Sequence, residues 1–212
     1  MNRPIGGEIS KMSSETVAFC FLCLSKPLIS KVIKKAEELA QKLGDKVISM
    51  EVGDAIKAAD IIVFSVWFNT IKELFSTYAT ELQGKIIVDP SNPIAPDDKG
   101  GFKKIIGENE SAGEILSSML PKSAKYVKAL GSLGVASLSK AAFQQPEKAV
   151  QFYATDDKSI EATIQELIKD DGYEPVSIGG VNQSIRMEVF VDLHEFGAIG
   201  KAVTASEAKS KI

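Results

Sequence analysis

Apolar residues follow two different spacings along this chain. Between residues 30 and 44 they recur at helical spacing, with Ser30 placed to cap a helix and Gly44 placed to end it. Between residues 60 and 66 the apolar residues are continuous instead of alternating. A continuous run indicates a strand buried on both faces, as in a parallel sheet that helices cover.

The same two patterns alternate over most of the sequence. Further helices are predicted over 53–60, 69–84, 111–121 and 158–172, and further strands over 46–50, 85–89, 124–130, 149–157 and 173–180. Strands that alternate with helices favour an α/β fold, a doubly wound parallel sheet with right-handed crossovers and helices on both faces.

The last part of the chain has a different pattern. Residues 181–203 are predicted to be helical, and residues 204–212 to be a solvated tail. The feature most like a domain boundary is the glycine pair at 179 and 180. We therefore expect one nucleotide-binding domain over 1–180, with an atypical opening over 1–29, and a C-terminal helical segment with a tail over 181–212.

Three of the predicted strands end in small or amide-bearing residues. The stretch "VDPSNP" follows the strand at 85–89, "SVWFN" follows the strand at 60–66, and "KALGSLG" follows the strand at 124–130. In an open parallel sheet, ligands bind beyond the carboxyl ends of the strands, where such loops converge. Each loop alone is more often a plain turn. The coincidence of three favours a binding site, with Ser91 and Asn92 as hydrogen-bonding groups.

Composition excludes several other classes of function. The net charge is −3, 44% of the residues are hydrophobic and 25% are charged, and basic residues form no stripe with interleaved aromatics. These values are typical of a soluble globular protein and argue against nucleic acid as a partner. The apolar stretch around Cys20 and Cys23 is too short to span a bilayer, so we expect no membrane association and a cytoplasmic location.

The cysteines and the histidine give no metal site. Cys20 and Cys23 form a C-x-x-C pair, but zinc needs four ligands and the chain has a single histidine, His194. Two buried small residues in a strand are the favoured interpretation of the cysteines, ahead of a redox pair. No nucleophile motif and no paired carboxylates stand at a strand end.

From Ser30 onward the chain resembles a known family. The stretches "KAEELAQKLG", "AADIIVFSVWF", "GKIIVDPSNP", "SAGEILSSMLPKSAKYVKAL" and "FYATDD", together with the later "QSIRMEVF", are similar in order and spacing to the NADP oxidoreductases that depend on the deazaflavin coenzyme F-420. The resemblance implies a Rossmann-like fold, which also occurs in the cytosolic domain of the STEAP metalloreductases.

The resemblance implies a cofactor and a set of residues around it. NADP(H) would lie across the strand ends, with Lys31 beside Ser30 taking the 2′-phosphate. The residues implied in cofactor binding are Ser30, Lys31, Ser65, Val66, Trp67, Phe68, Ser91, Asn92, Pro93, Ala129, Leu130 and Gly131. The family's usual "KAFNT" is "KALGS" here, so no asparagine side chain is available in that loop.

The activity implied by the resemblance is hydride transfer between NADPH and a flavin-like ring. Coenzyme F-420 or a flavin would be the co-substrate, and a small-molecule redox substrate is the expected partner, with a homodimer as the expected assembly. Hydride transfer depends on the alignment of two rings more than on an acid or a base. His194 is the one catalytic candidate, although a lone histidine in an apolar context is more often structural.

The opening of the chain departs from the family. A Rossmann chain begins with a strand and G-x-G-x-x-G, because the glycines let the pyrophosphate approach the backbone at a helix N-terminus. Here Gly6 and Gly7 are adjacent, and the pattern is absent from residues 1–29. Two hypotheses follow: an NADPH-dependent oxidoreductase, or a catalytically silent dinucleotide-fold protein that serves as a binding or interaction module.

Overall fold

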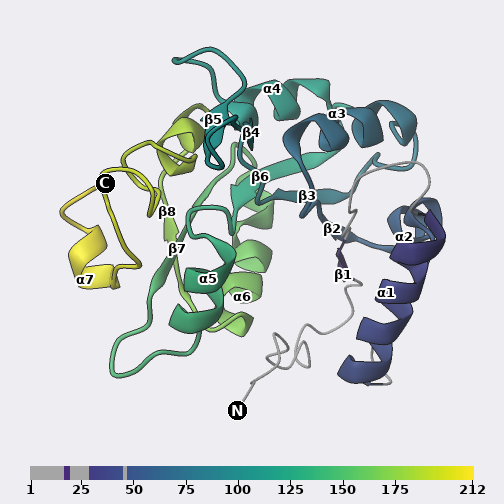
Figure 1. The fold of residues 1–212 in the computed structure, drawn as a ribbon, viewed down its shortest axis with the longest axis horizontal. Helices are drawn as coiled ribbons and strands as arrows, with labels where there is room; N and C mark the ends of the chain where they lie inside the picture. The colour runs from purple at the N-terminus through teal and green to yellow at the C-terminus, as the bar shows by residue number, and fades with distance from the viewer. Residues whose placement is uncertain (1–16, 20–28, 45–46) are drawn as a thin grey trace.

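A computed structural model describes residues 17–19, 29–44 and 47–212 of the chain. Its central feature is a sheet of the described strands in the order β1-β2-β3-β6-β7-β8 (Figure 1). These strands are β1 (Val17–Phe19), β2 (Ile61–Val63), β3 (Ile86–Asp89), β6 (Lys125–Ala129), β7 (Val150–Ala154) and β8 (Glu174–Ser177). The α/β class and the Rossmann-like sheet predicted from the sequence are confirmed.

The sheet is mostly parallel, with one change of direction. Neighbouring strands are parallel from β1 to β6, β7 runs antiparallel to β6, and β8 is parallel to β7. The sequence pattern predicted parallel strands throughout. It could not reveal the reversal, because every residue of β7 is buried and a strand buried on both faces has the same continuous apolar run in either direction.

Helices cover both faces of the sheet. The described helices are α1 (Ile29–Leu43), α2 (Val52–Ala58), α3 (Phe68–Thr77), α4 (Ala112–Met119), α5 (Val135–Ala141), α6 (Glu161–Asp170) and α7 (Ala205–Ala208). Ile62 and Ile87 pack with α2, α3 and α4, whereas Ile61 and Val88 point to the other face and pack with α5 and α6. Figure 1 shows these two groups of helices on opposite sides of the strands. The alternation of adjacent strand residues between the two faces is the period of two expected of a strand.

The first helix and its surroundings differ in detail from the prediction. α1 begins at Ile29, so Ser30 lies in its first turn and is not its cap. Gly44 ends the helix as predicted, with a φ of 89° and its N–H bonded to the Ala40 carbonyl. The strand predicted over 46–50 does not form in the described residues 47–50, where Ile48 is 77% exposed. Local apolar composition favours a strand there, but a strand also needs a neighbour to complete its hydrogen bonds.

The helix predicted over 69–84 ends earlier, at Thr77. The hydroxyl of Ser76 donates to the Lys72 carbonyl and that of Thr77 to the Glu73 carbonyl. Such back-bonding weakens a helix at its end. The chain then continues in turns to Gly84, whose φ is 74°.

The C-terminal part is less helical than predicted. A 3₁₀ helix, η3 (Val181–Met187), is followed by turns up to residue 199. Gly197 lies so close to the Val191 carbonyl that a Cβ there would overlap it, a tight fold-back that a straight helix does not contain. The tail predicted over 204–212 contains α7, which has a capping box of Thr204 and Glu207 and a buried Ala208. The division into 1–180 and 181–212 stays a prediction.

The sequence did not predict α5 or the antiparallel hairpin of β4 (Ile94–Pro96) and β5 (Phe102–Lys104). A second, short 3₁₀ helix, η2 (Lys158–Ile160), leads into α6. Across residues 17–19, 29–44 and 47–212, no helix is both long and apolar enough to cross a membrane.

Candidate functional site

The carboxyl ends of three parallel strands lie next to one another. β2 pairs with β3 up to Val63 and Val88, and β3 pairs with β6 up to Asp89 and Lys128. The segments that follow these strands therefore start from the same edge of the sheet. This edge carries most of the residues predicted to bind a cofactor. We call residues 65–68, 89–93 and 129–134 the strand-end loops.

The loop after β2 leads directly into α3. Ser65 is exposed, Val66 and Trp67 are half-buried, and Phe68 is buried as the first residue of the helix. The Trp67 ring lies 6.2 Å from the Phe102 ring of the hairpin, with the two planes tilted by 39°. The hairpin thus borders this end of the edge and supplies a second aromatic face.

A buried ion pair lies at the ends of β3 and β6. Lys128 Nζ is 2.7 Å from Asp89 Oδ2, and these side chains are 1% and 0% exposed. The Tyr126 hydroxyl donates to the same carboxylate oxygen at 2.5 Å. Burial, together with the charge of Asp89, raises the pKa of Tyr126 well above its usual value. Tyr126 is therefore a hydrogen-bond donor here and not a base.

The loop after β3 is tied to distant parts of the chain by Asn92. The Asn92 Nδ2 group donates to the Gly131 carbonyl at 3.0 Å, and its Oδ1 accepts from the Val189 N–H at 2.7 Å. Asn92 therefore clamps the loop after β3 to the loop after β6 and to the C-terminal segment. By contrast, the hydroxyl of Ser91 is buried and has no partner among the described residues. Pro93 is buried, and its carbonyl accepts from the Ile105 N–H at 2.9 Å.

The loop after β6 is held in a tight conformation. Leu130 has a φ of 63°, a left-handed conformation that is uncommon for a bulky residue. A Cβ on the next residue, Gly131, would overlap the Pro90 carbonyl, so glycine is required for the close approach of the two loops. Ala129, Leu130 and Gly131 are all buried. These residues can therefore contribute backbone groups and the shape of the surface to a site. This agrees with the absence of an asparagine from "KALGS".

The segment that covers these loops was not predicted as part of the site. Glu195 accepts a hydrogen bond from the Gly134 N–H through its side chain, and its own N–H donates to the Ser132 carbonyl at 3.0 Å. Glu188 is fully buried, and its Oε1 accepts from the Ser111 hydroxyl at 2.8 Å and from the Gly113 N–H at 3.0 Å, at the start of α4. Residues 188–197 are thus bonded to the loops after β3 and β6 and to α4. The sequence signal for Glu188 is a charge among the apolar residues of "MEVFV".

His194 lies within this covering segment. Its side chain is 2% exposed, and its Nδ1 accepts from the Phe196 N–H at 3.0 Å. Burial lowers the pKa of His194, and the nearby Glu195 and the Gly131 backbone oppose that shift. This geometry favours a neutral, structural histidine, and its catalytic role stays a prediction.

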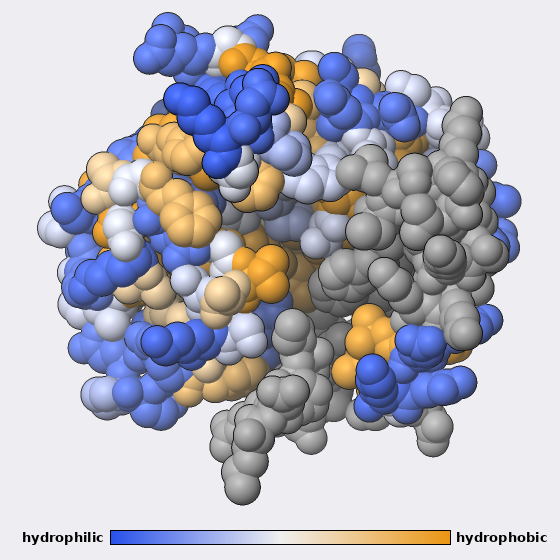
Figure 2. Space-filling view, in the orientation of Figure 1, coloured by the Kyte–Doolittle hydropathy of each residue, from blue (hydrophilic) through white to orange (hydrophobic). Residues whose placement is uncertain are grey.

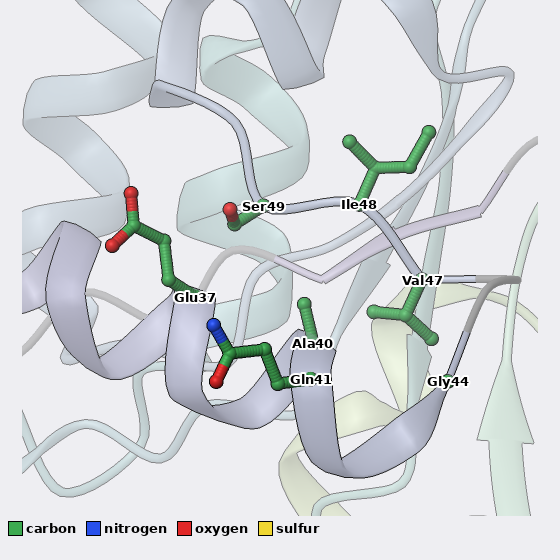
Figure 3. Close-up of a pocket in the computed structure, with 7 residues that line it drawn as sticks. All are labelled: Glu37, Ala40, Gln41, Gly44, Val47, Ile48 and Ser49. Carbon is green, nitrogen blue, oxygen red and sulfur yellow. The ribbon is translucent and has the colours of Figure 1, made fainter.

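The two residues predicted to lie at the 2′-phosphate, Ser30 and Lys31, belong to α1. Ser30 and Lys31 are in the first turn of α1, and their side chains fall outside the described part of the structure, as do residues 1–16 and 20–28 with Cys20 and Cys23. A hollow lies beside α1, nearer its C-terminal end (Figure 3). It is lined by Glu37, Ala40, Gln41, Gly44, Val47, Ile48 and Ser49. None of these described side chains is basic.

The visible face of the molecule shows where apolar side chains gather. In Figure 2 hydrophilic residues dominate the margins of the face, and both hydrophobic and weakly polar residues border a hollow near its centre. Among the described residues, no group of three or more histidine, cysteine, aspartate or glutamate side chains could hold a metal ion.

Comparison with known proteins gives a family for part of the chain. Residues 28–93 match the family described as "NADP oxidoreductase coenzyme F420-dependent". This span contains the loops after β2 and β3 but not the loop after β6. No curated protein matches the chain significantly.

Solved structures share the fold. A hypothetical protein of Sinorhizobium meliloti has a TM-score of 0.66 at 24% identity, covering 76% of this chain and 77% of that one. A protein of Arthrobacter sp. FB24, provisionally assigned as an F420-dependent NADP reductase, has a TM-score of 0.56 at 22% identity, covering 71% of this chain and 69% of that one. These similarities confirm the Rossmann-like architecture. The family match over residues 28–93 confirms the resemblance seen in the sequence to the coenzyme F420-dependent NADP oxidoreductases.

Proposed function

We propose that this protein is an oxidoreductase that transfers a hydride between NADPH and a flavin-like or deazaflavin acceptor at the strand-end loops. The observation that carries the proposal is the convergence of the loops after β2, β3 and β6 at one edge of the sheet. Two of these loops lie within the span that matches the NADP oxidoreductase family. Crevices at the carboxyl ends of parallel strands are the usual dinucleotide sites of this architecture.

The residues at this edge suit the nicotinamide half of a dinucleotide. Ser65 offers an exposed hydroxyl, and the half-buried Trp67 and the exposed Phe102 offer aromatic faces for a planar ring. The Ser91 hydroxyl has unused hydrogen-bonding capacity. When bound, NADP(H) would supply or accept the hydride, so the task of these residues is to hold the ring in position.

The proposed reaction needs little proton chemistry from the chain. Tyr126, Lys128 and His194 are buried, and each is already hydrogen-bonded to another group of the protein. We therefore assign them to the support of the loops. Lys31, after the position of the second Rossmann strand, is our candidate for the 2′-phosphate.

The alternative function is a catalytically silent dinucleotide-fold protein. It is favoured by one sequence observation, the absence of G-x-G-x-x-G from residues 1–29. The pyrophosphate would lose backbone N–H donors, and charge-assisted hydrogen bonds are worth about 1.5–3 kcal/mol each. Loss of two such bonds would weaken binding by roughly 10²-fold or more.

Turnover separates the two functions. Purified protein is mixed with NADPH and either FMN or coenzyme F-420, and the loss of NADPH absorbance is followed. Turnover above the rate without protein supports the oxidoreductase. Binding of NADPH by calorimetry without turnover on either acceptor would favour the silent protein, and absence of both would contradict a dinucleotide site.

A further inference from the structure

The ion pair of Asp89 and Lys128 is unusual because it is almost completely buried. The two residues are register partners in β3 and β6, and their charged atoms are 2.7 Å apart. Taking two charges out of water is costly, and a buried ion pair is often no more stabilising than an apolar pair of similar volume. Stability of the sheet alone therefore does not account for this pair.

The pair holds the main chain of the loop after β3. Asp89 Oδ1 accepts from the Ser91 N–H at 2.7 Å, and Lys128 Nζ donates to the Ser91 carbonyl at 2.5 Å. Both main-chain groups of Ser91 are thus bonded to the ion pair. Ser91 lies beyond the end of β3, where the bonds of the strand ladder no longer fix the chain.

The side chains of Ser91 and Asn92 have different roles. Both ends of the Asn92 amide are bonded, to Gly131 and to Val189. The Ser91 hydroxyl, in contrast, is buried without a partner among the described residues. A buried polar group without a partner is costly, and such groups are tolerated where function needs them.

We infer that Asp89 and Lys128 are positioning residues, which fix the Ser91 main chain and thereby the strand-end loop that faces the nicotinamide. Neither residue touches the cofactor, and both act through Ser91. This inference rests on the proposed function. It assigns to the ion pair a role in cofactor affinity that is separate from its contribution to folding.

A comparison of charged and apolar pairs tests the role. The variants are Asp89→Asn, Lys128→Met and the double variant Asp89→Leu with Lys128→Met, with Lys125→Met as the matched control. Lys125 is on the same strand but is 38% exposed in its ion pair with Asp157. The thermal unfolding midpoint and the Kd for NADPH are measured for each.

The double variant should be more stable than Lys128→Met, because it leaves no unpaired buried charge. It should nevertheless bind NADPH about tenfold more weakly than the wild type, since the Ser91 main chain is released. The control should keep the wild-type Kd. If the double variant folds and binds NADPH like the wild type, the positioning role is wrong.

Asp89→Asn keeps the inference testable if the double variant does not fold, because asparagine has nearly the same shape but removes the charge and replaces the oxygen that accepts from Lys128 and Tyr126 with an NH2 donor. Wild-type affinity in a folded Asp89→Asn protein would also overturn the role. If the wild type itself does not bind NADPH, the proposed function fails, and hydrogen exchange decides the inference. The Ser91 amide should then exchange faster in the double variant, where leucine cannot accept its N–H bond, than in the wild type, and an equal rate would contradict the inference.

Discussion

The edge formed by β3 and β6 differs from the region around α1 in how its residues are held. At the β3 and β6 ends, Asp89, Asn92 and Lys128 are bonded to the protein through nearly every polar atom. Beside α1, Ile48 is 77% exposed and Met50 is 48% exposed, and residues 47–50 form no strand. The nicotinamide half of the proposed site is therefore preorganised.

The opening of the chain differs from both regions. The α1 region and the loops after β2 and β3 lie in the span that matches the family, whereas residues 1–29 lack the glycine pattern of a pyrophosphate loop. A Rossmann site needs both halves, because the pyrophosphate and the nicotinamide belong to one ligand. The pyrophosphate half therefore decides between the two proposed functions.

The largest expected difference between the two regions concerns their isoleucines. Ile87 in β3 is 0% exposed, whereas Ile48 is 77% exposed. Ile87→Ala should lower the free energy of unfolding by about 2–5 kcal/mol through the cavity it leaves, and Ile48→Ala by less than about 0.5 kcal/mol. Urea denaturation measures both. Equal effects would show that residues 47–50 are packed as firmly as the sheet.

The covering segment should depend strongly on Glu188. Glu188→Ala leaves the Ser111 hydroxyl and the Gly113 N–H without their acceptor at the start of α4. We expect a loss of about 2–4 kcal/mol in the free energy of unfolding, measured by urea denaturation. The exposed Glu166 is the matched control, and Glu166→Ala should cost less than about 0.5 kcal/mol. A cost for Glu188→Ala no greater than that of the control would mean that the segment is not anchored there.

The close approach of the loops after β3 and β6 should make Gly131 sensitive. Gly131→Ala places a Cβ against the Pro90 carbonyl and should cost about 1–3 kcal/mol, with weaker NADPH binding. Gly84→Ala is the comparison, because Gly84 has a φ of 74° but open space around its Cα. That change should cost about 1 kcal/mol and leave binding unchanged. Calorimetry measures the Kd for NADPH of both variants. Equal Kd values would show that the close approach of the two loops does not matter for binding.

Asp171 is a half-buried carboxylate that can be compared with the fully buried Asp89. Unlike Asp89, it has a second carboxylate, Asp170, beside it, and burial followed by that charge raises the pKa of Asp171 from 3.8 to about 6. A raised pKa means that the folded state binds the proton more tightly, so this contribution to stability is full below about pH 4 and is lost as the pH rises through about 6.

Asp171→Asn should therefore raise the free energy of unfolding by roughly 1–3 kcal/mol at pH 8, with a much smaller effect at pH 4. Denaturation at the two pH values measures the change. The opposite order, with the larger gain at pH 4, would show that the carboxylate is stabilised in its charged form.

Local pattern predicted most of the architecture but only part of the site. The apolar run at 60–66 and the helical spacing over 111–121 need only nearby residues, and a strand and a helix form within these ranges as expected. The strand predicted over 46–50 does not form in the described residues 47–50, because a strand depends on a neighbouring strand for its hydrogen bonds. The antiparallel direction of β7 could not be predicted, because its buried apolar run is the same in either direction.

The contacts that build the site come from residues far apart in the sequence. Asn92 was predicted from its place after a strand, but its bond to Val189 depends on how the chain folds back after η3. Because residues 181–203 were predicted to be one helix, the covering segment was not recognised. Helical spacing does not show that Glu188 bonds to the start of α4. The buried pair of Asp89 and Lys128 could be found only once β3 and β6 were known to be neighbours.

The central claim is that NADP(H) binds at the strand-end loops, and the fluorescence of Trp67 tests it most directly. Trp67 is the single tryptophan of the chain and follows β2 at the proposed nicotinamide edge. Titration of the purified protein with NADPH should quench its fluorescence saturably, at micromolar concentrations if the site works despite its altered opening. No quenching up to millimolar NADPH would contradict the claim and leave a dinucleotide fold without its cofactor.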